Sequence, residues 1–247
     1  MERITSRKNP VIRYMKELGA DAGARAERGE MLCRGCKLLG EALAAGMHIG
    51  TVLYAAESEP QVPGARLYGV PAELLDYVSK GEPELLFTCS VPELAGEVNS
   101  AVVLEQVQDP GNVGTVIRTA AAFGVDAVVL VGASADPYGP KALRASMGAA
   151  FRVNVIKTDI PGLAELLKTR RMTLYAAVLA DDAADIRRLE RTEKTALAIG
   201  NEGHGLSDEL LALCERRFII PMDEASESLN AAAAAAVSMW ELFGKER

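Results

Sequence analysis

The sequence lacks the features that mark membrane-inserted, exported and metal-binding proteins. It holds no run of about eighteen apolar residues and no charged-then-apolar leader. Four cysteines in 247 residues are few for a disulfide framework, and the pair Cys33 and Cys36 has no second pair to complete a zinc site. A redox role for this pair stays open, but reduced thiols are favoured. We therefore expect a cytoplasmic protein with no membrane and no metal partner.

The motifs of three common enzyme classes are also missing. The glycines of GNVG (residues 111–114) fit neither the GxGxxG turn of dinucleotide enzymes nor a Walker loop. Tyr138 and Lys141 have the wrong spacing for the Tyr and Lys pair of one oxidoreductase type. Ser228 lies outside a GxSxG elbow, and His204 has no triad-like or metal-like companions. A nucleotide-dependent oxidoreductase on a doubly wound sheet is therefore disfavoured, and a serine hydrolase is not predicted.

The charge of the chain is unevenly distributed. The net charge of −7 argues, on its own, against a nucleic-acid partner. Residues 1–37, however, hold nine Lys or Arg and five Asp or Glu, a balance of +4, so the remaining residues carry −11. The first sixteen residues form a basic arm with Arg3, Arg7, Lys8, Arg13 and Lys16 against Glu2. Composition alone favours a solvated, frayed terminus, and the alternative is an element that contacts phosphates.

The pattern of apolar runs divides the chain into two sections. The first mixes helix and strand signals and ends in the polar segment 90–100, with expected helices at 10–18, 37–45 and 71–78 and expected strands at 49–56, 65–70 and 84–90. The second alternates helices with short apolar strands, expected at 101–107, 126–132, 152–156, 173–179, 194–200 and 217–222. Apolar strands of this kind are typical of a parallel sheet covered on both faces. We expect an α/β protein with domains at 1–95 and 96–247.

Polar residues follow three strands of the second section, where ligands bind in open α/β sheets. Asn112 is expected to cap the helix after the first strand, and Arg118 falls off the apolar stripe of that helix. Glu202 stands among glycines after the fifth strand, while Ser228 and Asn230 precede the final helix. Each residue alone is equally well explained as a cap or a solvated side chain. Their common position at strand ends favours a binding site.

Four segments of the second section resemble, in order and spacing, the signature motifs of the SpoU (TrmH-type) branch of the SPOUT methyltransferases. They are NVGTVIRTAAAFG, KALRASMGAAF, AIGNEGHGLS and IIPMDEASESLNAAAAAAV. The resemblance runs from about residue 101 to the C-terminus, and residues 1–95 look like the small L30e-type substrate-binding domain of many members. It implies a parallel sheet with a trefoil knot, a homodimer, S-adenosylmethionine as cofactor, and methylation of a ribose 2′-hydroxyl in RNA. Ribosomal RNA is favoured over transfer RNA, because the extra N-terminal domain resembles that of ribosomal-RNA enzymes.

The resemblance also implies roles for individual residues. The polar active-site set comprises Asn112, Arg118, Glu202, Ser228 and Asn230. The cofactor is expected to contact Gly200, Ile220 and Leu229, with Leu179 and Ala180 in the same pocket. RNA is expected to meet Arg144 and Ser146 as well as the basic arm. Glu224 stands where many relatives have glycine, so the loop before Ser228 departs from the family pattern.

Arg118 has two possible roles in this chemistry. A guanidinium has a pKa above about 12 and gives up its proton reluctantly. We therefore favour a role in binding the phosphate next to the target ribose and orienting its hydroxyl, over the role of base that some mechanisms for the family assign. Glu202 and Asn230 are expected to fix Arg118 and the cofactor loop. A transfer-RNA enzyme and a non-catalytic RNA-binding protein of the same fold are the alternatives, and the presence of all five polar residues argues against the second.

Overall fold

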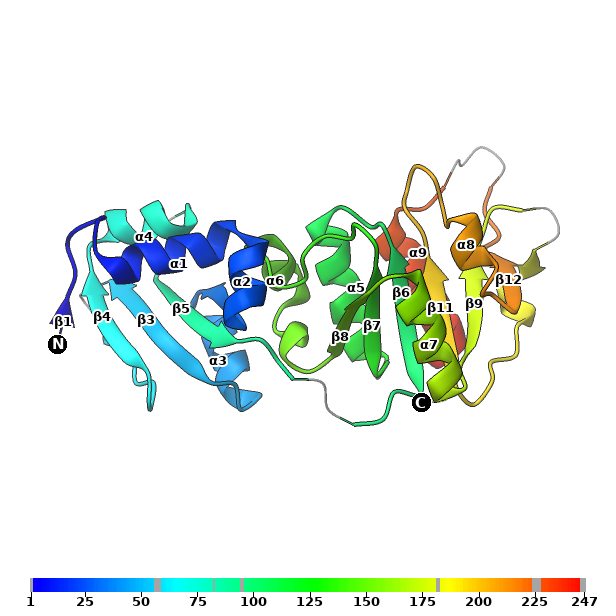
Figure 1. Ribbon diagram of the computed structural model, residues 1–247, viewed down its shortest axis with the longest axis horizontal. Coiled ribbons are helices and arrows are strands. Elements are labelled where there is room, and N and C mark those ends of the chain that lie inside the picture. The colour runs from blue at the N-terminus through cyan, green and yellow to red at the C-terminus, as the bar shows by residue number, and fades with distance from the viewer. Residues whose placement is uncertain are drawn as a thin grey trace. The chain divides into compact units, whose positions relative to one another are not determined.

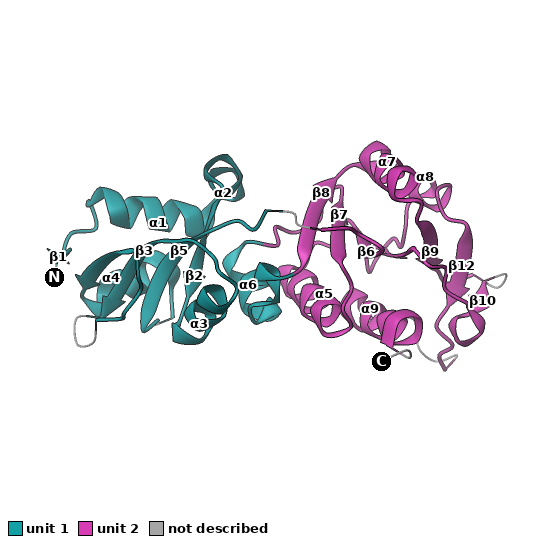
Figure 2. Ribbon diagram, turned by 90° about the horizontal axis from the view of Figure 1, so that it is seen from below, with its two compact units in different colours: residues 1–93, 138–152 teal, residues 94–137, 153–247 magenta. Residues whose placement is uncertain are grey.

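The computed structural model describes residues 2–55, 59–81, 83–93, 96–180, 183–223 and 228–244. Contacts between residues divide the chain into two compact units (Figure 2). Unit 1 comprises residues 1–93 and 138–152, and unit 2 comprises residues 94–137 and 153–247. The segment 138–152 therefore packs with the N-terminal residues. A boundary between two functions near residue 95 stays a prediction.

Unit 1 is built on a mixed five-stranded sheet with strand order β1-β4-β3-β5-β2 (Figure 1). Strands β1, β4 and β3 are parallel, whereas β5 is antiparallel to both β3 and β2. The strands are β1 (Glu2–Arg3), β2 (Glu30–Arg34), β3 (Ile49–Ala55), β4 (Arg66–Val70) and β5 (Leu85–Ser90). The helices are α1 (Pro10–Ala20), α2 (Ala22–Arg28), α3 (Cys36–Ala44), α4 (Ala72–Ser79) and α6 (Pro140–Ser146), and a 3₁₀ turn covers Ala149–Phe151. The expected elements of the first section are confirmed, while β2 and α2 were not expected.

The first residues of the chain are part of the core of unit 1. The side chains of Ile4, Ile12 and Met15 are almost fully buried, in a cluster that also contains side chains of α4 and β3. Asn9 caps α1, because its side chain accepts a hydrogen bond from the amide of Val11 at 2.8 Å. The interpretation of this segment as a frayed terminus is therefore wrong. Its cations lie on the exposed side of an ordered element.

Unit 2 is built on a seven-stranded sheet in which every strand pair is parallel, with strand order β10-β12-β9-β11-β6-β7-β8. The strands are β6 (Ser100–Glu105), β7 (Ala127–Val131), β8 (Asn154–Thr158), β9 (Thr173–Ala177), β10 (Ala184–Asp185), β11 (Thr195–Ile199) and β12 (Arg216–Ile219). The helices are α5 (Pro110–Ala122), α7 (Ile160–Arg170), α8 (Asp208–Leu211) and α9 (Ala231–Met239), followed by a π-helical turn (Trp240–Gly244), and Ile186–Arg188 forms a 3₁₀ turn. The predicted parallel sheet is confirmed, and the knot stays a prediction.

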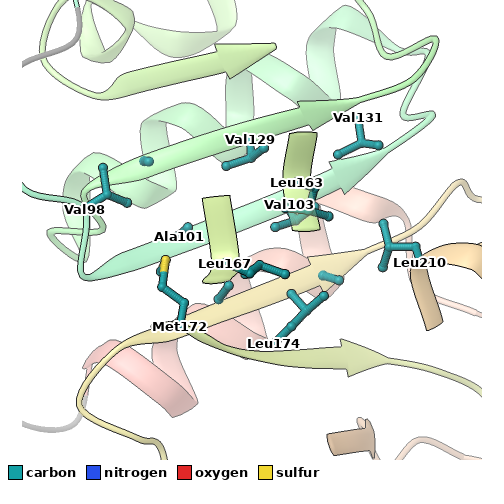
Figure 3. Close-up of a cluster of buried hydrophobic side chains, with 13 residues drawn as sticks. Val98, Ala101, Val103, Val129, Val131, Leu163, Leu167, Met172, Leu174 and Leu210 are labelled. Atoms are coloured by element: carbon teal, nitrogen blue, oxygen red, sulfur yellow. The ribbon is translucent and has the colours of Figure 1, made fainter. Parts of the chain in front are cut away.

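Helices cover both faces of this sheet (Figure 2). Helices α7 and α8 lie on one face, where Leu163, Leu167 and Leu210 pack against alternate residues of the central strands (Figure 3). Helices α5 and α9 lie on the other face and pack against each other. The apolar stripe expected along α5 is confirmed, because four apolar side chains of this helix are fully buried: Val113, Val116, Ile117 and Ala120. Burial on both faces explains why the strands are apolar at consecutive positions.

The residue that caps α5 is Asp109, and the expectation for Asn112 is wrong. The Asp109 carboxylate accepts a hydrogen bond from the amide of Gly111 at 2.6 Å, and Pro110 occupies the first helical position, where no amide hydrogen is needed. Asn112 lies within the first turn. Its side chain is therefore available for a contact outside the helix.

Two observations concern the membrane-inserted and metal-binding classes of protein that the sequence disfavours. In the part of the chain that the structure describes, no helix is long and apolar enough to cross a membrane. Within the same residues, no group of three or more His, Cys, Asp or Glu side chains is arranged to hold a metal ion. Cys33 is buried and Cys36 is exposed, and both are free thiols.

Candidate functional site

The carboxyl ends of four parallel strands meet at one edge of the unit 2 sheet, because neighbouring strands β6, β11, β9 and β12 all run the same way. A cavity of about 510 Å³ opens at this edge. It is lined by residues 177–180 after β9, by residues 199–206 of β11 and the loop after it, and by residues of the segment after β12 and of α9. The volume lies in the usual range for a small-molecule site.

The loop after β11 is held tightly by two glycines. A Cβ placed on Gly200 would lie 2.2 Å from the carbonyl carbon of Gly205, so no other residue fits there without moving the backbone. Gly205 has a φ of +69°, which favours glycine. Backbone hydrogen bonds in both directions join Asn201 to Gly205, at 3.0 and 2.8 Å. The loop therefore folds back on itself directly at the cavity.

The side chain of Asn201 connects this loop to the segment after β6. Its Nδ2 donates to the carbonyl oxygen of Gln106 at 3.0 Å, and its Oδ1 accepts from the amides of Gly203 and His204 at 2.8 and 3.2 Å. Gln106 itself has a φ of +53°, an uncommon backbone conformation for a residue with a side chain. Asn201 was not singled out from the sequence, although an Asn between a strand and a glycine-rich loop is a residue type that holds turns.

A buried carboxylate fixes the far end of the same loop. Glu105, the last residue of β6, is 2% exposed and accepts hydrogen bonds from the amide and the hydroxyl of Ser207, at 2.8 and 2.6 Å. Ser207 is also the N-cap of α8. Burial raises the pKa of the nearby Cys214 thiol to about 11, and the negative charge of Glu105 adds to the effect while Arg217 opposes it. The thiol is therefore protonated at neutral pH and is no candidate nucleophile.

Two of the expected active-site residues are in direct contact. The amide group of Asn112 donates a hydrogen bond to a carboxylate oxygen of Glu202 at 2.5 Å. A hydrogen bond to a charged acceptor is stronger than one between neutral groups, and this one joins α5 to the loop after β11 across 90 residues of sequence. Glu202 also lines the cavity. Its carboxylate is thus held at the rim, where it can bind a cationic or hydroxyl group.

All five residues expected to contact a cofactor line the same cavity: Leu179, Ala180, Gly200, Ile220 and Leu229. They come from the ends of three different strands and from the segment before α9. Leu179 is 65% exposed and Leu229 is 37% exposed. Exposed leucines at the mouth of a cavity are apolar surface that a bound ligand would cover. Their roles stay predictions.

The remaining polar residues are placed differently from one another. Ser228 lines the cavity, and so does the exposed His204. Asn230 caps α9, with its side chain accepting from the amide of Ala233 at 2.7 Å. Arg118 is exposed on α5 and is not among the residues that line the cavity, and neither Glu202 nor Asn230 contacts it in the described part of the chain. The expectation that Glu202 and Asn230 fix Arg118 therefore has no support within one chain and stays a prediction.

The residues expected to meet RNA are exposed, with one exception. Arg3, Arg7, Lys8, Arg13 and Arg144 all lie at the surface of unit 1. The guanidinium of Arg7 lies 4.6 Å from the ring centre of Tyr77. The Nζ atom of Lys16 lies 3.4 Å from the same ring centre. Ser146 is fully buried, and its hydroxyl donates to the carbonyl oxygen of Leu143 at 2.9 Å. Contrary to the expectation, the Ser146 hydroxyl is not exposed for direct contact with RNA, because it lies on the buried side of α6. Glu224 lies outside the described residues.

Known proteins resemble the chain over nearly its whole length. A family model described as the SpoU rRNA Methylase family matches residues 99–240. The 23S rRNA (guanosine(2553)-2′-O)-methyltransferase RlmP of Bacillus subtilis is 31% identical over 252 residues, which cover 99% of this chain and 100% of that protein. The 23S rRNA (uridine(2479)-2′-O)-methyltransferase of Streptomyces viridochromogenes is 29% identical, covering 97% of this chain and 91% of that protein. The crystal structure of the SpoU methyltransferase AviRb from Streptomyces viridochromogenes, in complex with AdoMet, superposes with a TM-score of 0.88 at 26% identity and covers 97% of this chain and 98% of that one.

The tight loop after β11 leads to a prediction about its glycines. We expect Gly200→Ala to open the loop, because its Cβ would meet the backbone of Gly205. Hydrogen exchange of a peptide covering residues 200–207 should rise about tenfold or more, since a local destabilisation of about 1.4 kcal/mol raises opening tenfold. Gly203→Ala is the matched control, because its nearest neighbour is the side-chain oxygen of Asn201 at 3.3 Å. Equal exchange in the two variants would contradict the close approach of the two glycines.

Proposed function

We propose that this chain, which belongs to the SpoU rRNA methylase family, acts on 23S ribosomal RNA in the cytoplasm. Its activity is the S-adenosylmethionine-dependent methylation of ribose 2′-hydroxyls in ribosomal RNA. Two relatives that match nearly the whole chain, including unit 1, are named for methylation of that RNA. They are named for different nucleosides, a guanosine and a uridine. The target base therefore does not follow from the family alone.

One observation carries the assignment of the cofactor site. The five residues that the motifs imply for cofactor contact surround a single cavity, and a glycine-rich loop forms one wall. The adenosine part of S-adenosylmethionine needs apolar surface with backbone amides and carbonyls at its edge. Leu179, Ile220 and Leu229 supply the first, and the loop that begins at Gly200 supplies the second. The carboxylate of Glu202, at the rim, suits the positive charge of the cofactor.

The reaction needs the attacking ribose oxygen to be placed in line with the methyl group. When bound, S-adenosylmethionine supplies that methyl group in activated form on a sulfonium. Positioning of the hydroxyl then accounts for most of the rate. We assign this task to Arg118, whose planar guanidinium can hold the phosphate beside the target ribose with two parallel hydrogen bonds. Asn112 keeps the Glu202 carboxylate at the rim.

Removal of the Arg118 guanidinium separates its role from cofactor binding. We expect Arg118→Ala to lower the methylation rate at least a hundredfold, because the ribose loses its positioning group, while affinity for S-adenosylmethionine stays within a few-fold. Methyl transfer to unmodified 23S RNA and calorimetric titration with the cofactor measure the two quantities. Lys168→Ala, which removes an exposed cation of α7 on the opposite face of the sheet, should change neither. A loss of cofactor affinity as large as the loss of rate would sink the proposed role.

A second copy of the chain offers a place for Arg118. The layer formed by α5 and α9 exposes two large apolar side chains, Val237 at 42% and Trp240 at 53%, and the ring of Trp240 contacts Phe123 just after α5. Exposed apolar groups of this size favour a protein interface. We propose a homodimer through this layer, with Arg118 of one copy completing the cavity of its partner. The proposal accounts for an exposed Arg118 that does not line its own cavity.

A mixing experiment tests whether Arg118 acts in the partner's cavity. We expect Arg118→Ala and Gly200→Ala each to be inactive alone. The first variant lacks the guanidinium, and the second lacks an intact loop at the cofactor cavity. After unfolding and refolding together in equal amounts, half of the dimers are mixed, and each has one intact cavity served by one intact Arg118. We expect about a quarter of wild-type activity by this count. A mixture as inactive as the separate variants would place Arg118 in its own chain's site.

The basic arm should contribute to RNA affinity through its exposed cations. Deletion of residues 1–16 cannot test this, because it removes the buried Ile4, Ile12 and Met15. We expect the triple variant Arg7→Gln, Lys8→Gln, Arg13→Gln to bind 23S RNA more weakly, with the slope of log affinity against log salt lower by about 0.7 to 0.9 for each phosphate that the arm no longer neutralises. The control triple Lys168→Gln, Arg170→Gln, Arg171→Gln removes the same charge from the end of α7. Equal slopes for the two triples would rule out binding of RNA phosphates by the arm.

A further inference from the structure

Unit 1 contains a larger cavity that neither the motifs nor the family assignment explains. Its volume is about 660 Å³, and its walls come from α3, the ends of β2 and α4, and α6, which packs against β2 (Figure 2). The whole lining belongs to unit 1. We call it the α3–α6 cleft.

The rim of the α3–α6 cleft is strongly basic. Five cationic residues line it: Arg34, Lys37, Lys80, Lys141 and Arg144. The lining residues include only two carboxylates, Glu41 and Glu84. Glu41 is already neutralised by an ion pair with Arg152 at 2.5 Å, and Glu84 accepts a hydrogen bond from the Cys36 thiol at 3.2 Å. An anion therefore meets an excess of positive charge here, in a chain whose overall charge is −7.

Part of this positive charge is fixed in place. The guanidinium of Arg34 donates hydrogen bonds to the carbonyl oxygens of Lys80 and Gly81, the first at 2.8 Å. These two bonds tie the end of β2 to the turn after α4. The N-terminal end of α3 also opens on the cleft at Gly35, where no side chain caps the helix. The positive end of the α3 dipole thus adds to the charge of the side chains.

The floor of the cleft is apolar. Leu32, Leu38, Leu143, Met147 and two prolines line the cleft alongside the basic residues, and we call these apolar residues its floor. Met147 is 38% exposed although it is a large apolar side chain, and its backbone has a φ of +52°. A small anion such as phosphate would leave this floor in contact with water. A ligand that covers it must have both a charged and a flat apolar part.

We propose that the α3–α6 cleft holds one unpaired nucleotide of the substrate RNA, with its phosphate among the rim cations and its base against the apolar floor. The inference rests on the proposed RNA substrate and adds a second contact, remote from the methyl-transfer cavity in sequence and independent of it. Bases within a duplex are stacked and cannot enter a cleft, whereas loop and bulge nucleotides can be splayed out into one. The cleft therefore selects an RNA that carries an unpaired nucleotide. An acidic protein segment could also satisfy the rim, but the RNA that the family methylates favours a nucleotide.

Two single variants separate the phosphate contact from the base contact. Arg144→Gln removes an exposed cation of the rim, and Met147→Asn removes the exposed apolar surface of the floor without a change of charge. Asparagine tolerates the left-handed backbone of position 147, so the fold is preserved. Lys168→Gln, an equal loss of charge on α7 in unit 2, is the matched control. Affinity of the full chain for unmodified 23S RNA is measured by filter binding over a range of salt concentrations.

We expect both variants to bind RNA about three- to tenfold more weakly than Lys168→Gln, the order of effect of removing a single side chain that touches nucleic acid. For Arg144→Gln the salt slope should fall by about 0.7, the value for one phosphate of a single strand, while for Met147→Asn it should not change. If Met147→Asn binds as tightly as the control, no base occupies the floor and the proposal is overturned. If neither variant loses affinity, the cleft takes no RNA and an acidic protein segment is left as its occupant. Failure of the wild-type chain to methylate 23S RNA would instead contradict the proposed function. The binding measurements would still show whether the cleft binds RNA.

Discussion

The close approach of Gly200 to Gly205 is the constraint on which the unit 2 cavity depends. The two backbones come so near that a single methyl group between them does not fit. Because of this contact, the chain reverses immediately after β11 and leaves space above the strand ends, where the cavity lies. The reversal also aims Asn201 at Gln106 and Glu202 at Asn112. One steric condition thus connects the loop after β11 to the segments that follow β6.

The second support of the cavity is electrostatic. Glu105 is a carboxylate buried among apolar strands, and burial of a charge is unfavourable unless the group is hydrogen-bonded. Both its oxygens accept hydrogen bonds from Ser207, which in turn caps α8. Loss of the Ser207 hydroxyl would remove one of these two hydrogen bonds from the buried carboxylate. This pair and the glycine contact thus hold the loop after β11 at its two ends. A loop held at both ends presents its backbone to a ligand in one conformation, which lowers the entropic cost of binding.

Much of this arrangement could be predicted from the sequence, and the failures have physical reasons. The strands of unit 2 are apolar at consecutive positions, so their order along the chain and parallel direction followed from pattern alone. The short strand β2 was missed because it begins and ends with a charged residue, Glu30 and Arg34, and carries only three apolar side chains. Asn112 was expected to cap α5 because Asn is a good cap, but Asp109 followed by Pro110 fits that position better. Glu105 and Asn201 were missed since nothing in one sequence tells a buried, paired polar residue from a solvated one.

The family motifs indicated residues that lie near one another, whereas packing between distant segments could not be predicted from them. Whether those residues bind the cofactor stays a prediction. The five residues expected to contact the cofactor gather around one cavity. Ser146 stands in a motif that suggested exposure, yet it is buried where α6 packs. The α3–α6 cleft could not be foreseen, because its walls come from residues 32–41, 79–84 and 140–147, and no pattern in the sequence indicates that these segments meet.

The order of the first residues also changes how the protein would meet RNA. Basic N-terminal segments that are disordered in the free protein lose conformational freedom when they bind, and that loss weakens the complex. Here Ile4, Ile12 and Met15 anchor the segment in the core, and the ring of Tyr77 orients Arg7 and Lys16. The surface that carries these cations is rigid before any RNA arrives. An RNA bound through the proposed contact would therefore need a backbone whose phosphates are already spaced to match these cations.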